Sequence, residues 1–497
     1  MEVKGFNLHA FDQYLSFDDI LLKPGHSSVL PNEVDHSSQL GPFKLSVPIL
    51  SAAMDTVTEA EMAIALSLRG ALGVIHKNLS IEDQVNEVKK VKNFQHAIIR
   101  SPLTVRADDD LAAVREIVKK TKISGFPVLD QNKKLVGILT ERDFRYAPAK
   151  LKKVKDVMTS KVFSLPEGSS KEEALEFFRK FKVEKLPLVD KQGKLTGLIT
   201  SSDWRKTESF PLAQRDSKGS LTVAAAIGAG EDGFERAQAL YTAGADCLVL
   251  DSAHGHSEGI INTLKKIKKN MDVVLIAGNV GTAEGAEALI KAGADIIKIG
   301  IGPGSICTTR VVSGVGVPQF TAVYDICSKN RKKYPKVGFI ADGGIRYSGD
   351  VVKALAAGAH AVMLGSLFAG TAESPGDQIL YRGRAYKLYR GMGSITAMKK
   401  GSKDRYGQAG VEASKLVPEG VEARVAFKGS VHDVLFQLLG GLRAGMGYVG
   451  AANLEELVKK ARFVRITNSG LRESHVHDVQ ITAEAPNYTA HREGDNE

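Results

Sequence analysis

The chain has 497 residues, 43% hydrophobic and 25% charged, which is an ordinary globular composition with enough length for a large core and a second domain. Its three cysteines, Cys247, Cys307 and Cys327, are an odd number at irregular spacing, which fits neither a disulfide framework nor a zinc site. The net charge of +10 is spread over amphipathic helical patterns, and no recognised nucleic-acid-binding motif accompanies it, so we do not expect nucleic acid as a partner. No apolar run reaches the roughly 20 residues of a membrane helix. We therefore expect a cytoplasmic protein.

The first strong pattern along the chain is a pair of short apolar runs, residues 48–54 and 72–77, with a helical pattern between them. Continuous apolar runs of this length are typical of parallel strands that are buried on both faces. They predict the first two strands of an α/β sheet.

An internal repeat follows these strands. Residues 102–145 align with residues 162–205 at a constant offset of 60. Each copy has apolar residues at helical spacing followed by two short strands, which predicts a small α+β module. The pair resembles a tandem of cystathionine-β-synthase-type (CBS) domains, and this resemblance implies a regulatory nucleotide bound in the clefts between the modules.

Two Thr-x-x-Asp motifs recur at matching positions of the repeat, Thr140 with Asp143 and Thr200 with Asp203. In CBS domains such a motif holds the ribose of the nucleotide. Threonine and aspartate also favour the N-caps of helices that follow strands. The sequence leaves both roles open.

Six more apolar runs follow the repeat and alternate with helical patterns. They cover residues 223–228, 246–251, 273–278, 296–301, 337–344 and 361–366. Eight strands predict a TIM (β/α)8 barrel that the tandem module interrupts between strands two and three. The predicted parts are residues 1–95 and 213–497 for the barrel and 96–212 for the module. A doubly wound open sheet is the alternative, because alternation alone does not show closure.

Glycine-rich turns follow the seventh and eighth strands, at Gly343–Gly344 and Gly365–Ser366. In TIM barrels these two loops commonly bind phosphate, because glycine lets backbone N–H groups approach an anion and a helix N-terminus adds partial positive charge. Tight turns alone would also account for glycine, but two such turns at adjacent positions favour phosphate. Asp342, beside the first turn, is placed to accept hydrogen bonds from ribose hydroxyls.

Cys307 is the candidate nucleophile, because it lies just beyond a glycine-rich loop at the end of the sixth strand. A thiolate at such a position is a strong nucleophile when positive charge lies nearby, and Arg310 is one source of that charge. Cys247 and Cys327 lie in an apolar strand and a helical pattern, which favours buried, inert thiols.

The loop GIGPGSICTTR around Cys307 resembles the active-site loop of the inosine monophosphate (IMP) dehydrogenase family. The resemblance extends over FDDILLKPGHSS, SAAMDTVTE, DSAHGH, ADGGIRYSGD, YRGMGS and GLRESHVHDVQITAEAPNY. It implies that Cys307 attacks C2 of the purine, that a hydride passes to NAD, and that water then hydrolyses the covalent intermediate to xanthosine monophosphate (XMP).

The resemblance also assigns site residues. The nucleotide would contact Ser305, Asp342, Gly343, Gly344, Gly365, Ser366, Tyr389, Arg390, Gly391, Met392, Gly393 and Glu419. The NAD cofactor would contact Asp251, Gly300, Ile301 and Gly302. The catalytic residues would be Cys307, Thr309, Arg405 and Tyr406.

The segment 399–419 is polar, contains glycine and lacks periodicity, which indicates a mobile loop. In the family a flap here carries an Arg-Tyr pair that enters the site for hydrolysis, and Arg405 and Tyr406 match it. An arginine base would need special surroundings, because its pKa lies above about 12.

The family also binds a monovalent cation, usually potassium, between two subunits. The matching residues are Gly302, Gly304 and Cys307, with Glu473, Ser474 and His475 from a neighbouring subunit. Such a shared site implies a homotetramer, and some members stack tetramers into octamers through the inserted domains.

Two alternatives remain. Guanosine monophosphate (GMP) reductase shares the barrel, the cysteine and the phosphate loops, but the inserted module and the Arg405–Tyr406 pair are expected chiefly of the dehydrogenase. A nucleotide-sensing protein without catalysis would show damage to the catalytic loop or the flap, and the sequence shows none.

Overall fold

The computed structural model describes residues 13–94, 102–121, 123–148, 151–169, 171–201, 210–408 and 410–488, so the predicted boundary at residues 95–96 lies outside them. Contacts divide the chain into two compact units. The first comprises Met1–Phe94, Leu212–Asp216 and Leu221–Glu497, and the second comprises Gln95–Pro211 and Ser217–Ser220.

The first unit is built on an eight-stranded parallel sheet in the order β4-β17-β16-β15-β14-β13-β12-β5. Its strands are β4 (Ile49–Ser51), β5 (Val74–Ile75), β12 (Ala224–Ile227), β13 (Cys247–Asp251), β14 (Val274–Val280), β15 (Ile296–Ile299), β16 (Gly338–Asp342) and β17 (Ala361–Leu364). The two ends of the sheet meet, because Ser51 N donates to Leu72 O at 3.1 Å and Leu72 N donates to Ile49 O at 3.2 Å. The predicted TIM barrel is confirmed, and the open-sheet alternative is wrong.

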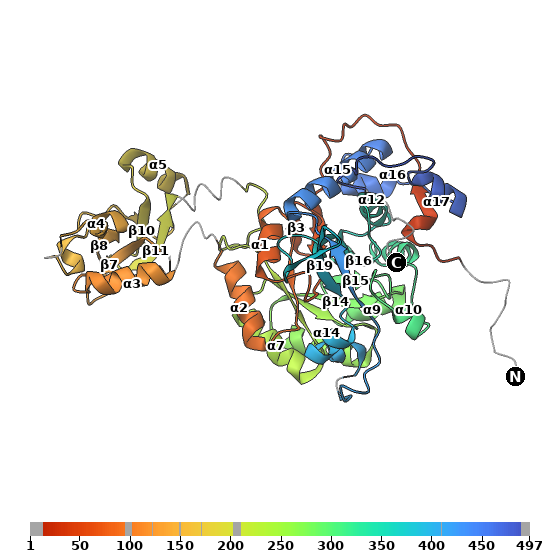
Figure 1. The fold of residues 1–497 in the computed structure, drawn as a ribbon, viewed down its shortest axis with the longest axis horizontal. Helices are drawn as coiled ribbons and strands as arrows, with labels where there is room; N and C mark the ends of the chain where they lie inside the picture. Colours follow the sequence, from red (N-terminus) through yellow and green to blue (C-terminus); the bar gives the residue numbers. More distant parts are fainter. Residues whose placement is uncertain are drawn as a thin grey trace. The chain divides into compact units, whose positions relative to one another are not determined.

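Helices between the strands cover the outside of the barrel. They include α1 (Ala60–Leu68), α2 (Ile81–Lys92), α7 (Gly230–Thr242), α8 (Glu258–Asn270), α9 (Ala283–Lys291), α11 (Gln319–Asn330) and α12 (Ser348–Ala356). Figure 1 shows α1, α2 and α7 next to one another along one side of the strands. In α8, Ile260, Leu264 and Ile267 are buried at helical spacing, as expected of a helix with one face on the sheet.

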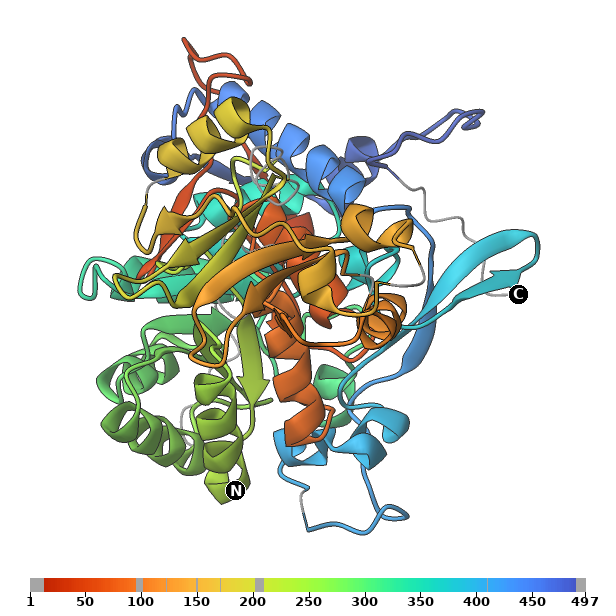
Figure 2. The ribbon, with the colours of Figure 1, turned by 90° about the vertical axis from the view of Figure 1, so that its left-hand side faces the viewer.

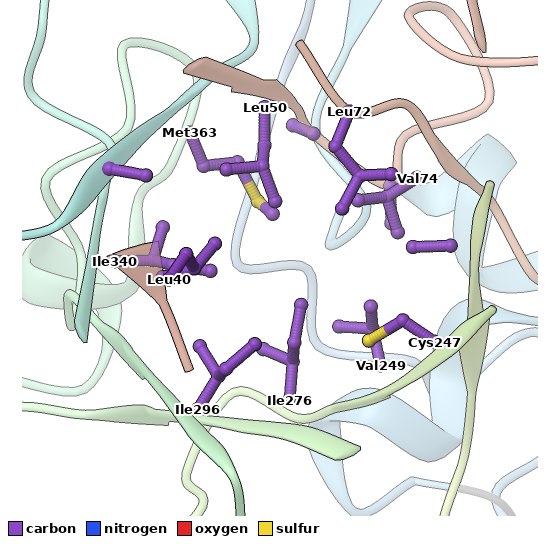
Figure 3. Close-up of a cluster of buried hydrophobic side chains, with 14 of the residues drawn as sticks. Leu40, Leu50, Leu72, Val74, Cys247, Val249, Ile276, Ile296, Ile340 and Met363 are labelled. Carbon is purple, nitrogen blue, oxygen red and sulfur yellow. The ribbon is translucent and has the colours of Figure 1, made fainter. Parts of the chain in front are cut away.

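Apolar side chains from every strand fill the barrel. The buried cluster includes Leu50, Leu72, Val74, Val249, Ile276, Ile296, Ile340 and Met363, which point toward a common centre in Figure 3. Leu40 and Leu45 join it from the hairpin of β2 (Ser38–Leu40) and β3 (Phe43–Leu45). A Cβ built at Gly338, the first residue of β16, would lie 2.7 Å from Gly41 N in this hairpin. The hairpin therefore lies at the N-terminal ends of the strands, opposite the end where barrel enzymes carry their sites.

The chain after β17 adds a small antiparallel sheet of β18 (Gln378–Tyr381), β19 (Arg384–Arg390) and β20 (Glu422–Ala426), whose light blue β18–β19 hairpin extends away from the helices in Figure 2. Helix α14 (Ile395–Lys400) and the 3-10 helix η3 (Ser402–Tyr406) lie between β19 and β20. The chain continues with α15 (Val431–Val449), α16 (Leu454–Lys460), β21 (Phe463–Arg465), which pairs with β1 (Ile20–Leu22), and α17 (Asn468–Ser474). None of the helices in the described ranges is long and apolar enough to span a membrane.

The second unit repeats one arrangement of elements. Its first copy has β6 (Val105–Arg106), α3 (Leu111–Thr121), β7 (Gly125–Leu129) and β8 (Leu135–Thr140), and its second has β9 (Leu165–Pro166), α5 (Lys171–Phe181), β10 (Lys185–Val189) and β11 (Leu195–Thr200). All eight bounds recur at the predicted offset of 60, and even the register shift between Val128 and Leu129 recurs between Leu188 and Val189. The unit follows β5 and precedes β12, the second and third barrel strands in chain order.

The Thr140–Asp143 pair caps the short helix α4 (Glu141–Arg145). The Asp143 carboxylate accepts hydrogen bonds from Thr140 N at 2.7 Å and from Thr140 Oγ1 at 2.8 Å. The capping role is therefore present, and the ribose role stays a prediction. Thr200 ends β11, whereas Asp203 lies outside the described residues.

Candidate active site

A cavity of about 140 Å³ lies at the C-terminal ends of the barrel strands. It brings together predicted residues that are far apart in the chain, from Asp251 at the end of β13 to Glu419 before β20. The predicted site residues that line it are Asp251, Gly300, Gly302, Gly304, Cys307, Asp342, Gly343, Gly365, Tyr389, Gly391, Met392, Arg405, Tyr406 and Glu419. The predicted residues Ser305, Gly344, Ser366, Arg390, Gly393, Ile301 and Thr309 are not part of the lining.

Cys307 is half-buried in the loop between β15 and the short helix α10 (Thr309–Val312). Its Sγ donates to Thr309 Oγ1 at 3.2 Å. The loop is held against the chain that leads into β20, because Thr308 N donates to Glu419 O at 3.0 Å and Val421 N donates to Ile306 O at 3.0 Å. Main-chain hydrogen bonds of the residues before and after Cys307 thus hold the loop that places the sulfur at the cavity wall.

Arg310 joins the start of this loop to the chain that follows α10. Its Nε donates to Ile301 O at 3.2 Å and its Nη2 donates to Val317 O at 2.5 Å. Burial lowers the pKa of Arg310, and its electrostatic interaction with Cys307 acts in the opposite direction. The guanidinium hydrogen-bonds main-chain carbonyls, and the part of Arg310 in the ionisation of Cys307 stays a prediction.

The other two cysteines are buried, as predicted. Burial raises the pKa of the Cys327 thiol to about 12 and raises the pKa of Cys247 still further. Neither thiol ionises near neutral pH, so neither competes with Cys307 as a nucleophile.

The predicted phosphate turns have the geometry that glycine requires. Gly343 has a φ of 89°, in the left-handed region that glycine adopts without strain. At Gly365, an added Cβ would lie only 2.8 Å from Tyr389 Oη. Burial raises the pKa of Tyr389 to about 12, while a hydrogen bond with Ser305 acts in the opposite direction. Tyr389 is therefore a neutral hydroxyl at the cavity wall.

Lys298 is a residue of the cavity lining that the sequence analysis did not select. It lies within β15, its side chain is 2% exposed, and its Nζ donates to Asp251 Oδ1 at 2.8 Å and to Asp342 Oδ2 at 2.7 Å. It also donates to Asn279 Oδ1. A buried charge is stable only when it is paired and hydrogen-bonded, and Lys298 has both kinds of partner. It joins the predicted cofactor carboxylate to the predicted ribose carboxylate.

Two amides complete this network. Asn279 Nδ2 donates to Gly300 O at 2.7 Å and to Asp342 Oδ2 at 3.0 Å. Gln319 Nε2 donates to Ile299 O at 2.9 Å and to Asp342 O at 3.1 Å. Asp342 is thus held through both its side chain and its main chain. A lysine inside the apolar run IIKIGI was a signal of this network in the sequence.

The Arg405–Tyr406 pair lies in the cavity. Arg405 Nη1 forms an ion pair with the second carboxylate oxygen of Asp251, and Arg405 O accepts a hydrogen bond from Ala253 N at 3.1 Å. Arg405 Nε is buried and has no hydrogen-bond partner among the described residues. Burial raises the pKa of Tyr406, and Arg405 acts in the opposite direction.

Two groups of predicted residues lie elsewhere. Arg390 donates from Nε to Asp55 Oδ1 at 2.9 Å, so its guanidinium is engaged in an ion pair. Burial acts to raise the pKa of Asp55, but hydrogen bonds from Arg390 and Asn78 bring it below its ordinary value.

The residues predicted for the cation site of a neighbouring subunit, Glu473, Ser474 and His475, lie at the end of α17, outside the cavity lining. In the described ranges, no three His, Cys, Asp or Glu side chains cluster closely enough to hold a metal ion.

Comparison with known proteins identifies the family. Residues 14–477 match the model of the IMP dehydrogenase / GMP reductase domain. The chain belongs to this family. Two similar proteins are both named inosine-5'-monophosphate dehydrogenase. The protein from Aquifex aeolicus is 57% identical, and the alignment covers 95% of this chain and 97% of that relative. The protein from Streptococcus pyogenes is 54% identical, and the alignment covers 96% of this chain and 97% of that relative.

A solved member of the family has the same fold. The crystal structure of a GMP reductase variant from Trypanosoma brucei in complex with guanosine 5'-monophosphate matches with a TM-score of 0.87 and 41% identity, over 95% of this chain and 99% of that one. Because only 5% of this chain is left unmatched, the match includes most of the inserted unit. The inserted unit was expected chiefly of the dehydrogenase, and this match shows that it does not by itself distinguish the two activities.

Proposed function

We propose that this chain catalyses the NAD-dependent oxidation of IMP to XMP, the dehydrogenase activity of its family. The observation that carries the proposal is its 57% identity over 480 residues to a curated dehydrogenase, against 41% identity to the solved reductase. The intact Cys307 loop and the Arg405–Tyr406 pair in one cavity support it and argue against a protein that has lost catalysis.

The chemistry divides into two steps at Cys307. The thiolate sulfur forms a bond to C2 of the purine, and the hydrogen on C2 leaves with its electron pair. NAD accepts this hydride when it is bound. Water then attacks C2, the C2–S bond breaks, and the sulfur leaves as the thiolate while the water gives up a proton to a base. This sequence is covalent catalysis that separates oxidation from hydrolysis.

The two ligands meet the cavity from different strands. The nucleotide takes the side of Asp342, Gly343 and Gly365, where the ribose hydroxyls donate to the carboxylate and the turns receive the phosphate. NAD takes the side of Asp251 and Gly300. The Asp251 carboxylate and Gly300 both line this side of the cavity. Arg405 pairs with the same carboxylate, so NAD would bind there only when Arg405 leaves it.

Arg405 and Tyr406 act in the hydrolysis step. The Arg405 Nε–H, which has no hydrogen-bond partner among the described residues, can donate to the attacking water, and the guanidinium can take up the proton of that water only after it has itself lost a proton. The buried Tyr406 hydroxyl stays protonated and can donate a hydrogen bond. Thr309, whose hydroxyl contacts Cys307 Sγ, orients the sulfur.

A potassium ion would bind at Gly302, Gly304 and Cys307 together with Glu473, Ser474 and His475 of a neighbouring subunit in a homotetramer or octamer. Main-chain carbonyls are suitable ligands for such an ion, and the first three residues lie on one loop. The bound ion would hold the Cys307 loop in one conformation. The inserted tandem, residues 96–212, would bind a regulatory nucleotide as a CBS pair.

The test is to mix the purified protein with IMP and NAD in potassium buffer, follow NADH absorbance and identify the purine product by chromatography. We expect NADH and XMP to appear in equal amounts. Activity with GMP and NADPH in place of this reaction would establish a reductase.

A further inference from the structure

Lys77, which follows β5, is a buried cation outside the groups assigned so far. Its side chain is 6% exposed, and its ammonium group forms an ion pair with the carboxylate of Asp404. Asp404 lies in η3, directly before Arg405. The pair therefore joins the rigid end of a barrel strand to the segment that carries the hydrolytic residues.

Asp404 fits a slot in the barrel rim. A Cβ at Gly228, just after β12, would lie 2.5 Å from Asp404 Oδ2, so the glycine leaves the room that the carboxylate occupies. On its other side, Asp404 Oδ1 accepts a hydrogen bond from Arg405 N at 2.8 Å. Lys77 thus fixes Asp404, and Asp404 fixes the backbone from which the Arg405 side chain extends.

Two ion pairs hold the Asp404–Arg405 segment against the barrel. Lys77 pairs with Asp404, and Arg405 pairs with Asp251 on β13. Without Lys77 the Asp404 carboxylate would keep its electrostatic interaction with Arg236 and the hydrogen bond from Arg405 N, but it would lose its ion pair with the barrel strand end. A carboxylate that loses its ion pair at a partly buried site is released into water more readily. Burial lowers the pKa of Lys77 and the Asp404 charge acts in the opposite direction, which agrees with a cation that depends on this partner.

We propose that Lys77 is a positioning residue for hydrolysis, which docks the Arg405–Tyr406 segment in the cavity through Asp404. The inference rests on the proposed function. The proposed role of Lys77 affects only one of the two chemical steps. Hydride transfer needs NAD in the cavity, whereas hydrolysis needs Arg405 there. Loss of the pair lowers the docked fraction and so slows hydrolysis alone.

The experiment compares full-length Lys77→Met, Asp404→Asn and the double variant with the wild type by stopped-flow and steady-state kinetics with IMP and NAD. We expect the rapid NADH burst to keep its rate within about twofold, and steady-state turnover to fall roughly tenfold as the covalent intermediate accumulates. The double variant should be no slower than the slower single variant, because both break one interaction. Lys77→Arg should restore much of the turnover.

A second readout is inhibition by excess NAD. A weakly docked segment competes less well with NAD for the cavity, so inhibition should begin at a several-fold lower NAD concentration in Lys77→Met. Lys269→Met, at an exposed lysine on α8, is the matched control and should behave as the wild type.

Three results would overturn the inference: equal slowing of burst and turnover, unchanged turnover, or additive effects in the double variant. If Lys77→Met does not fold, Asp404→Asn and Lys77→Arg still decide the question, because both keep the lysine site charged. Absence of any NADH from the wild type would count against the proposed function itself.

Discussion

In the proposed mechanism, the position of Arg405 decides which half of the reaction proceeds. Its guanidinium pairs with Asp251, the carboxylate assigned to the cofactor, while its Nε is buried and free of hydrogen bonds to the described residues. A buried donor without a partner is costly, so such a group in a native site usually awaits a ligand. Water that attacks the Cys307 intermediate is the ligand that the proposed function supplies.

Arg405→Ala should slow hydrolysis far more than hydride transfer. Loss of a group that contacts the attacking water costs about 10²–10⁴-fold in that step. Rapid mixing with IMP and NAD, with the NADH burst and the steady-state rate followed separately, measures both steps. A burst that slows together with turnover, or a hydrolysis rate equal to that of the wild type, would remove Arg405 from this role.

At the residue scale, the sequence allows a prediction for a residue whose position in a loop has a chemical meaning of its own, but not for a residue whose role depends on partners from other strands. Cys307 could be singled out because its loop position has a chemical meaning on its own. The role of Lys298 depends on Asp251, Asn279 and Asp342, which come from three other strands, and only folding shows that they meet. Arg390 was predicted to contact the nucleotide, and only the folded structure shows that its guanidinium pairs with Asp55.

His360, which precedes β17, links the stability of this part of the barrel to pH. Its ring stacks on Phe339 of β16 with centroids 5.8 Å apart. Burial, with a further contribution from Arg331, lowers the pKa of His360 from 6.5 to about 3. The folded state therefore binds fewer protons than the unfolded state between these values, so the stabilisation is complete above pH 6.5 and is lost as the pH falls toward 3.

Each pH unit in this window should cost about 1.4 kcal/mol of unfolding free energy through His360. His360→Phe removes the titration, so its unfolding free energy should fall less steeply than that of the wild type between about pH 6.5 and 5. Chemical denaturation at a series of pH values gives the slopes, and His432→Gln, at an exposed histidine on α15, is the control. Equal slopes in His360→Phe and wild type would contradict the assignment.

Strand prediction succeeded because each barrel strand is buried on both faces and reads as a continuous apolar run. Most of the bounds are shorter in the structure, although β14 extends to Val280, beyond the run 273–278. The run 72–77 contains only β5, Val74–Ile75. The chain leaves the sheet there to place Lys77 and Asn78 at the rim. Apolar composition marks burial, whereas the end of a strand depends on hydrogen-bonded neighbours, which lie far away in the sequence.

At the scale of the whole molecule, the insertion leaves the barrel uninterrupted. β5 and β12 pair directly in parallel, with Ala224 opposite Val74 and Ala225 opposite Ile75, although the second unit lies between them in the chain. The hydrogen bonds that close the barrel therefore involve no residue of that unit. The repeat was visible in the sequence, because a duplicated fold retains residues at a constant offset.

Replacement of residues 95–211 by a short glycine-serine linker should leave turnover within about threefold of the wild type, because loop-closure cost changes slowly with length. The response to added adenine and guanine nucleotides should disappear. Turnover at a series of nucleotide concentrations measures both effects. Loss of a folded, active barrel, or a nucleotide response that survives the replacement, would contradict this account.

The central claim, a covalent intermediate on Cys307 that water later releases, is tested most directly by mass spectrometry of the enzyme quenched in acid during turnover with IMP and NAD. The account predicts that the peptide with Cys307 gains the mass of the oxidised nucleotide, and that Cys307→Ala binds IMP but forms neither adduct nor NADH. XMP formation by the Cys307→Ala variant, or turnover of the Arg405→Ala variant with no adduct on Cys307, would contradict it.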